Sequence, residues 1–127
     1  MNRRKYIRTL AAAGAAAAVP AQGVDPIQLH VDLDVAPTQQ KDFSGTYHKV
    51  FRPAISRQPG FVDVKLMKLR SALAGSPPAN SNYRLIISFQ TEEQRKAWVA
   101  TDLHQKVWPQ MEKHLKSKYS AILYDLI

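Results

Sequence analysis

The chain has 127 residues, the length of one domain, and a formal net charge of +8. It contains no cysteine, which excludes disulfides and thiolate metal sites. Four of the 18 basic residues precede residue 22, whereas the first acidic residue is Asp25. Residues 22–127 carry 14 basic and 10 acidic residues, a net charge of +4, which is ordinary for a single domain. The basic composition is therefore poor evidence for a nucleic-acid partner, and none is expected.

The first 21 residues have the pattern of a secretory signal peptide. A charged segment from Asn2 to Arg8 precedes an alanine-rich run from Leu10 to Val19, and small residues up to Ala21 offer a cleavage site. The apolar run is too short for a stable membrane span. The Arg3-Arg4 pair resembles a twin-arginine signal, although an alanine-rich helix with a basic start is the alternative. The sequence predicts export and a mature domain, residues 22–127, in the periplasm or outside the cell.

The first half of the mature chain predicts a strand, a helix and a second strand. Apolar and polar residues alternate from Ile27 to Val35, as in a half-buried strand. Apolar residues at helical spacing predict a helix from Gln39 to about Arg57, which Pro53 is expected to kink or to end early. After a turn, Phe61 to Arg70 predicts the second strand. The following segment, Ser71 to Asn82, is a loop that is long for a hairpin connection.

The second half predicts a broken helical segment between two strands, Tyr83 to Gln90 and Tyr119 to Ile127. The helical segment runs from Thr91 to Leu115, with Thr91 as its N-cap and Gln94 in the capping-box position. Two features could interrupt it. Thr101-Asp102 could end one helix and cap the next. Pro109 removes a backbone donor. A helix broken in its middle seals less tightly onto a sheet, so it is a plausible wall for a small cavity.

The expected order is strand, helix, strand, strand, helix, strand. This order indicates an α+β, ferredoxin-like βαββαβ domain with two helical segments on one face of an antiparallel four-stranded sheet. The other face of the sheet would still need cover. A second copy packed sheet to sheet would provide it, so we expect a homodimer.

The domain from about Ile27 to Ile127 resembles the antibiotic biosynthesis monooxygenase family of the dimeric α/β-barrel superfamily. Two short stretches carry the resemblance: RQPGF at residues 57–61, similar to the family's turn from helix to strand, and WVATDLH at residues 98–104, similar to its tryptophan, helix break and histidine. The resemblance implies a dimeric α/β barrel with a small apolar pocket between helices and sheet. It also implies oxidation of small aromatic or quinol-type compounds by dioxygen with no metal or other cofactor.

The resemblance and the residue types together name candidate site residues. His104 is the candidate catalytic base, because a histidine with a pKa near neutrality can accept a phenolic proton. Its alternative role is that of a surface or capping histidine after the helix break. Aromatic side chains suit a flat ring, although such stripes are commonly core. The candidates for substrate contact are Trp98, Trp108, Tyr47, Phe51 and Phe89.

Two other kinds of site are disfavoured. A haem-degrading branch of the superfamily uses an asparagine on the first strand, which has none here, and its haem-ligand histidine would fall at about Trp108. His30, Asp32 and Asp34 share one strand face and could in principle bind a metal. Alternate residues of a straight strand point in parallel and rarely converge on one ion, so no metal site is expected.

Two alternative functions remain open. The same fold could serve as a non-catalytic ligand-binding or stress-related protein, with a pocket but no productive base. It could also be an RNA-binding domain, which would need stacking aromatics on the exposed strand face. The polar residues of the first strand and the export signal disfavour RNA. The enzyme and the binding protein differ at His104, because a base must point into a closed pocket beside Trp98.

Overall fold

The computed structural model describes residues 25–127. The predicted signal peptide, residues 1–21, lies outside the described residues and stays a prediction. The elements follow one another as β1 (Ile27–Leu33), the 3-10 turn η3 (Pro37–Gln39), α1 (Gln40–Thr46), the π-helical turn η4 (Tyr47–Phe51), α2 (Arg52–Ile55), β2 (Phe61–Lys68), β3 (Tyr83–Phe89), α3 (Glu92–Val99), α4 (Asp102–Glu112) and β4 (Ser120–Asp125).

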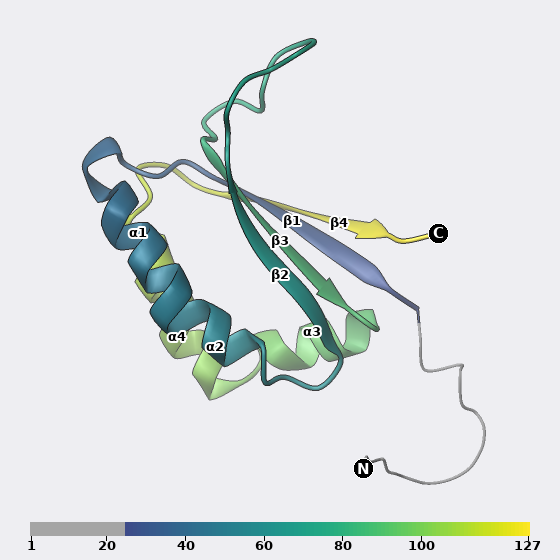
Figure 1. The fold of residues 1–127 in the computed structure, drawn as a ribbon. Helices are drawn as coiled ribbons and strands as arrows, with labels where there is room; N and C mark the ends of the chain where they lie inside the picture. The colour runs from purple at the N-terminus through teal and green to yellow at the C-terminus, as the bar shows by residue number, and fades with distance from the viewer. Residues whose placement is uncertain (1–24) are drawn as a thin grey trace, which may run out of the picture.

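The four strands form one sheet in the order β2-β3-β1-β4, with every neighbouring pair antiparallel. The helices all lie on one side of this sheet (Figure 1). This arrangement confirms the predicted α+β, ferredoxin-like fold. The two central strands, β1 and β3, are the most buried, and β4 is an edge strand that is exposed along its length. Alternate residues of the central strands meet the helices in a single apolar core.

The first helical run extends from α1 through η4 into α2, close to the predicted range, but its middle turn is a π-helix. Pro53 lies at the start of α2, directly after this wide turn, and does not end the helix there. Proline has no N–H for the preceding turn and its ring crowds a carbonyl, which a wider turn accommodates. Phe51, the last residue of η4, is only 1% exposed and points toward the sheet side of the helices.

The break in the second helical segment lies at Thr101, not at Pro109. Thr91 caps α3 by accepting a hydrogen bond from the N–H of Gln94 at 3.1 Å. Thr101 caps α4 in the same way, accepting from the N–H of His104 at 3.1 Å. Pro109 sits inside α4, which continues to Glu112. A capping hydroxyl stabilises the first turn of a new helix, whereas a proline within a helix removes one backbone hydrogen bond. The helical segment is therefore interrupted at the Thr101 cap.

The turn before β2 depends on Gly60. Its φ of +80° lies in the left-handed region that favours glycine. A Cβ at this position would collide with the side-chain amide of Gln94 from α3. The RQPGF stretch therefore makes the turn into β2 with a glycine in a backbone conformation that other residues rarely adopt.

The face of the sheet turned away from the helices carries hydrogen-bonded polar pairs. Asp32 forms two hydrogen bonds with Arg84, at 2.7 and 3.2 Å, and His30 is bonded to Gln28 at 2.7 Å. Asp34 is buried and accepts a hydrogen bond from Ser117 at 2.9 Å. Residues 25–127 contain no group of three or more side chains arranged to hold a metal ion. Across the same range, no helix is both long and apolar enough to pass through a membrane.

Candidate functional site

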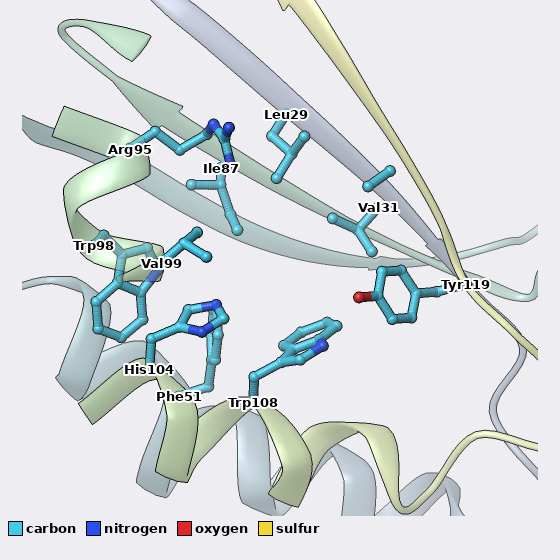
Figure 2. Close-up of a pocket in the computed structure, with 11 residues that line it drawn as sticks. Leu29, Val31, Phe51, Ile87, Arg95, Trp98, Val99, His104, Trp108 and Tyr119 are labelled. Carbon is cyan, nitrogen blue, oxygen red and sulfur yellow. The ribbon is translucent and has the colours of Figure 1, made fainter. Parts of the chain in front are cut away.

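A small apolar cavity lies between the sheet and the second helical segment. Its volume is about 190 Å³. Figure 2 shows side chains converging on it from the sheet, from α3 and α4, and from the segment before β4. The lining residues are Leu29, Val31, Phe51, Ile87, Arg95, Trp98, Val99, His104, Trp108, Tyr119 and Ala121.

His104 is placed in this cavity by the break between α3 and α4. The hydroxyl of Thr101 donates to the carbonyl of Trp98 at 2.7 Å while it accepts from the N–H of His104. One side chain thus joins the end of α3 to the start of α4. The imidazole of His104 packs edge-on against Trp98, with ring centroids 5.0 Å apart, and nearly parallel to Trp108, at 6.4 Å (Figure 2).

The imidazole of His104 carries an unsatisfied polar atom. Its Nδ1 is closed off from solvent, and no group within residues 25–127 forms a hydrogen bond with it. Burial is the main cause that lowers the pKa of His104, and the nearby positive charge of Arg95 lowers this pKa further. The ring is therefore neutral at pH 7 and has a nitrogen free to accept a proton or a hydrogen bond from a ligand.

His114, which lies just beyond the end of α4, shows the contrast. It is 4% exposed, and its ring nitrogens contact Gln39 Oε1 at 2.9 Å and Thr46 Oγ1 at 3.2 Å. Both polar atoms of a structural histidine are thus satisfied in this fold. The vacant Nδ1 of His104 is a property of the cavity and not of the domain in general.

Aromatic rings form the walls of the cavity. Phe51 contacts Trp98 and Trp108 edge-on, with centroids 6.3 and 5.8 Å apart. Tyr119 stands edge-on to Trp108 at 5.2 Å, on the far side from His104 (Figure 2). Such rings present flat apolar surfaces with edge hydrogens, which suit a planar aromatic ligand.

The structure brings together four of the residues predicted for the site: His104, Trp98, Trp108 and Phe51. Tyr47 and Phe89 are not part of the lining. Tyr47 is 3% exposed, and its hydroxyl donates to the carbonyl of Val64 at 3.4 Å. Phe89 is fully buried at the end of β3 and packs edge-on against Phe61. Both occupy the core, where the sequence pattern alone cannot separate a core ring from a pocket ring.

Seven lining residues were not predicted, and two of them, Arg95 and Tyr119, carry polar groups. Arg95 lies three residues before Trp98 on α3, and residues at that spacing share a helix face. That spacing was the available signal. Tyr119 directly precedes the edge strand, and no spacing rule links it to the helices that it meets.

No protein-family model matches the sequence, and no curated protein matches it. Solved structures do. A candidate antibiotic biosynthesis monooxygenase from Caulobacter crescentus matches with a TM-score of 0.66 and 15% identity, covering 82% of this chain and 92% of that one. One from Bordetella bronchiseptica gives a TM-score of 0.65 and 17% identity, covering 81% and 98%. SnoaB, a cofactor-independent oxygenase from Streptomyces nogalater, gives a TM-score of 0.64 and 15% identity, covering 79% and 91%.

The domain has the antibiotic biosynthesis monooxygenase fold. At these levels of identity the matches establish the shared fold, whose chemistry must still be argued from the site. The resemblance carried by RQPGF and WVATDLH is thereby confirmed at the level of fold. In this monooxygenase fold, the first of those stretches makes the turn before β2, and the second makes the helix break that places His104.

Proposed function

We propose that the protein belongs to the antibiotic biosynthesis monooxygenase family and oxidises a small aromatic or quinol-type compound with dioxygen, without a cofactor. The observation that supports this most is the buried, unpartnered Nδ1 of His104 in a cavity walled by aromatic rings. Leaving such an atom unsatisfied costs roughly 1–3 kcal/mol. A ligand that supplies the missing partner recovers that cost, so the vacancy favours a polar ligand group at this point.

The proposed reaction needs electrons from the substrate alone. The substrate reacts through its phenolic tautomer, in which the carbon that is CH₂ in the keto tautomer is a conjugated ring C–H. His104 takes the proton of the phenolic O–H, and the resulting anion delocalises its charge onto that carbon. The carbon adds dioxygen in two one-electron steps, and the proton held by His104 completes the hydroperoxide R₂CH–OOH. His104 then takes the remaining C–H proton, the O–O bond breaks as the carbon becomes a carbonyl, and the hydroxide that leaves receives this proton and becomes water. The balance is R₂CH₂ + O₂ → R₂C=O + H₂O, in which the carbon loses four electrons and dioxygen gains four.

The apolar lining supports these steps by limiting contact between water and the substrate and by holding a ring in place. Trp98 and Phe51 are almost completely buried, and the sheet contributes only apolar side chains to the lining. A dry site keeps the substrate anion from being reprotonated by solvent and preserves dioxygen for the ring. The lowered pKa of His104 keeps the imidazole neutral, and hence basic, at neutral pH.

The working form that we propose is an exported homodimer. The outer face of the sheet carries exposed apolar side chains beside its polar pairs, among them Ile122 at 48% and Tyr124 at 51% exposure. A second copy packed on this face would cover them. Export rests on the twin-arginine-like N-terminus.

Oxygen uptake tests the proposal. The purified full-length protein is supplied with a panel of one- to three-ring phenols, quinols and anthrones, beside His104→Ala and, as a matched control, His48→Ala. His48 is exposed on η4 and does not line the cavity. General-base catalysis contributes about 10²–10⁴ in rate, so we expect a loss of at least about 100-fold in His104→Ala and no change in His48→Ala.

The fate of the oxygen atoms and the metal dependence complete the test. With ¹⁸O₂, one labelled atom should appear in the product carbonyl and one in water, and a chelator should leave the rate unchanged. Turnover equal in the wild type and His104→Ala would remove His104 from the mechanism. Absence of any turnover, with ring compounds still quenching tryptophan fluorescence, would instead indicate the non-catalytic ligand-binding protein.

A further inference from the structure

Arg95 is the charged member of the cavity lining. Every other lining residue is aliphatic, aromatic, or the imidazole of His104. The guanidinium comes from α3 and reaches the hollow beside Leu29 and Ile87 (Figure 2). Placing a permanent positive charge in an otherwise apolar lining is costly unless a counter-charge accompanies it.

Glu92 supplies part of that counter-charge and fixes the guanidinium in place. Arg95 Nε donates to Glu92 Oε1 at 2.6 Å, and Nη2 donates to Oε2 at 2.7 Å. The two side chains are only 20% and 24% exposed. These bonds raise the pKa of Arg95, so the group stays charged. A bidentate pair of this kind orients the planar group and leaves the two N–H bonds of Nη1 for another acceptor.

The cavity volume limits the size of what can bind. At about 190 Å³ it is close to the roughly 150 Å³ engineered cavity that holds benzene and below the roughly 300 Å³ at which drug-sized pockets begin. One substituted ring, or two fused rings, can therefore lie between Trp98, Trp108 and Tyr119. A three-ring compound would have to extend past the lining into solvent.

We propose that the ligand of this cavity is an aromatic acid of one or two rings, bound with its ring among the tryptophans and its carboxylate on Nη1 of Arg95. The inference rests on the proposed function for the identification of the cavity as a substrate site. A substrate of this class would carry its reacting hydroxyl toward His104 and its carboxylate toward Arg95. Arg95 would then select the substrate, and His104 would act on it.

The test separates charge from shape. Isothermal calorimetry of the full-length protein with 2-naphthoate is compared with its neutral analogue 2-naphthamide and with the three-ring anthracene-2-carboxylate. None of these probes needs to be turned over. We expect 2-naphthoate to bind at least tenfold more tightly than either of the others.

Two variants assign the selectivity to Arg95. Arg95→Gln should weaken 2-naphthoate at least tenfold and change 2-naphthamide less than twofold, which also shows that the cavity is intact. Lys96→Gln removes one exposed positive charge from the next position of α3, outside the lining, and should change neither. Equal binding of acid and amide, equal losses for both in Arg95→Gln, or full affinity for the three-ring acid would overturn the proposal.

The two proposals fail in distinguishable ways. If 2-naphthoate shows the expected selectivity but hydroxylated aromatic acids consume no oxygen, the ligand class stands and the monooxygenase activity does not. If hydroxylated aromatic acids are oxidised at the same rate by Arg95→Gln and wild type, the activity stands and the role of Arg95 is lost.

Discussion

Replacing His104 with phenylalanine should stabilise the fold, which is the opposite of what a buried ring substitution normally does. The change keeps an aromatic ring between Trp98 and Trp108 and removes the buried Nδ1 that lacks a partner. The extra ring volume enters a cavity and not a filled core, so overpacking is small. His104→Phe should also abolish turnover, because stability and activity compete at such a site.

The magnitude follows from the cost of the unsatisfied atom. Removing a buried polar group without a partner recovers roughly 1–3 kcal/mol, less a fraction because the rest of His104 is only half-buried. We therefore expect a gain of about 1 kcal/mol in the free energy of unfolding. For a domain of this size that corresponds to a rise in Tm of roughly 4–8 °C.

Urea and thermal unfolding at pH 8, where the lowered pKa values leave His104 and His114 neutral, measure this gain. His114→Phe is the matched control, since it leaves Gln39 and Thr46 without their ring partners and should lose about 2 kcal/mol or more. If His104→Phe loses as much stability as His114→Phe, then Nδ1 of His104 is satisfied in solution and the argument from its vacancy is refuted.

Three further predictions concern the fold as a whole. Burial lowers the pKa of His114 from 6.5 in the folded protein, so the unfolded chain binds a proton more readily as the pH falls. The urea midpoint should therefore decrease as the pH drops below about 6.5, and a flat profile would contradict this prediction. Gly60→Ala should cost about 1–3 kcal/mol, because φ is positive and the Cβ meets Gln94, whereas Gly45→Ala, in an open helical position of α1, should gain up to about 1 kcal/mol. Tyr124→Lys should shift the proposed homodimer to monomer in sedimentation velocity, and an unshifted dimer would place the interface elsewhere.

The order of strands and helices could be predicted from local sequence patterns, whereas the lining of the cavity could be predicted only in part. The alternation of β1 and the two threonine caps are signals between residues close in sequence, so the strand and the helix break could be predicted. Phe51 lines the cavity from the end of the π-helical turn η4. Phe89 does not line it, because it lies at the end of β3 and is buried in the core. Such facts arise when distant elements pack.

Arg95 could not be assigned to the cavity from the sequence for the same reason. On the helix it appears as one more charged residue in a polar segment, with Glu92 as an ordinary partner one turn earlier. That face of α3 becomes a wall of the cavity only because β1 and the segment before β4 pack opposite it. A charge on a helix surface and a charge in a pocket have the same sequence pattern.

The hydroxyl of Thr101 has a consequence for how this site assembles. It ties Trp98 to His104 within seven residues, and the N–H of Thr101 also bonds the carbonyl of Trp98, at 3.1 Å. Contacts between residues this close in sequence cost little loop-closure entropy, so they can form before the sheet has assembled. The relative position of the tryptophan and the histidine is therefore set by local bonds, while the sheet supplies the opposite wall of the cavity.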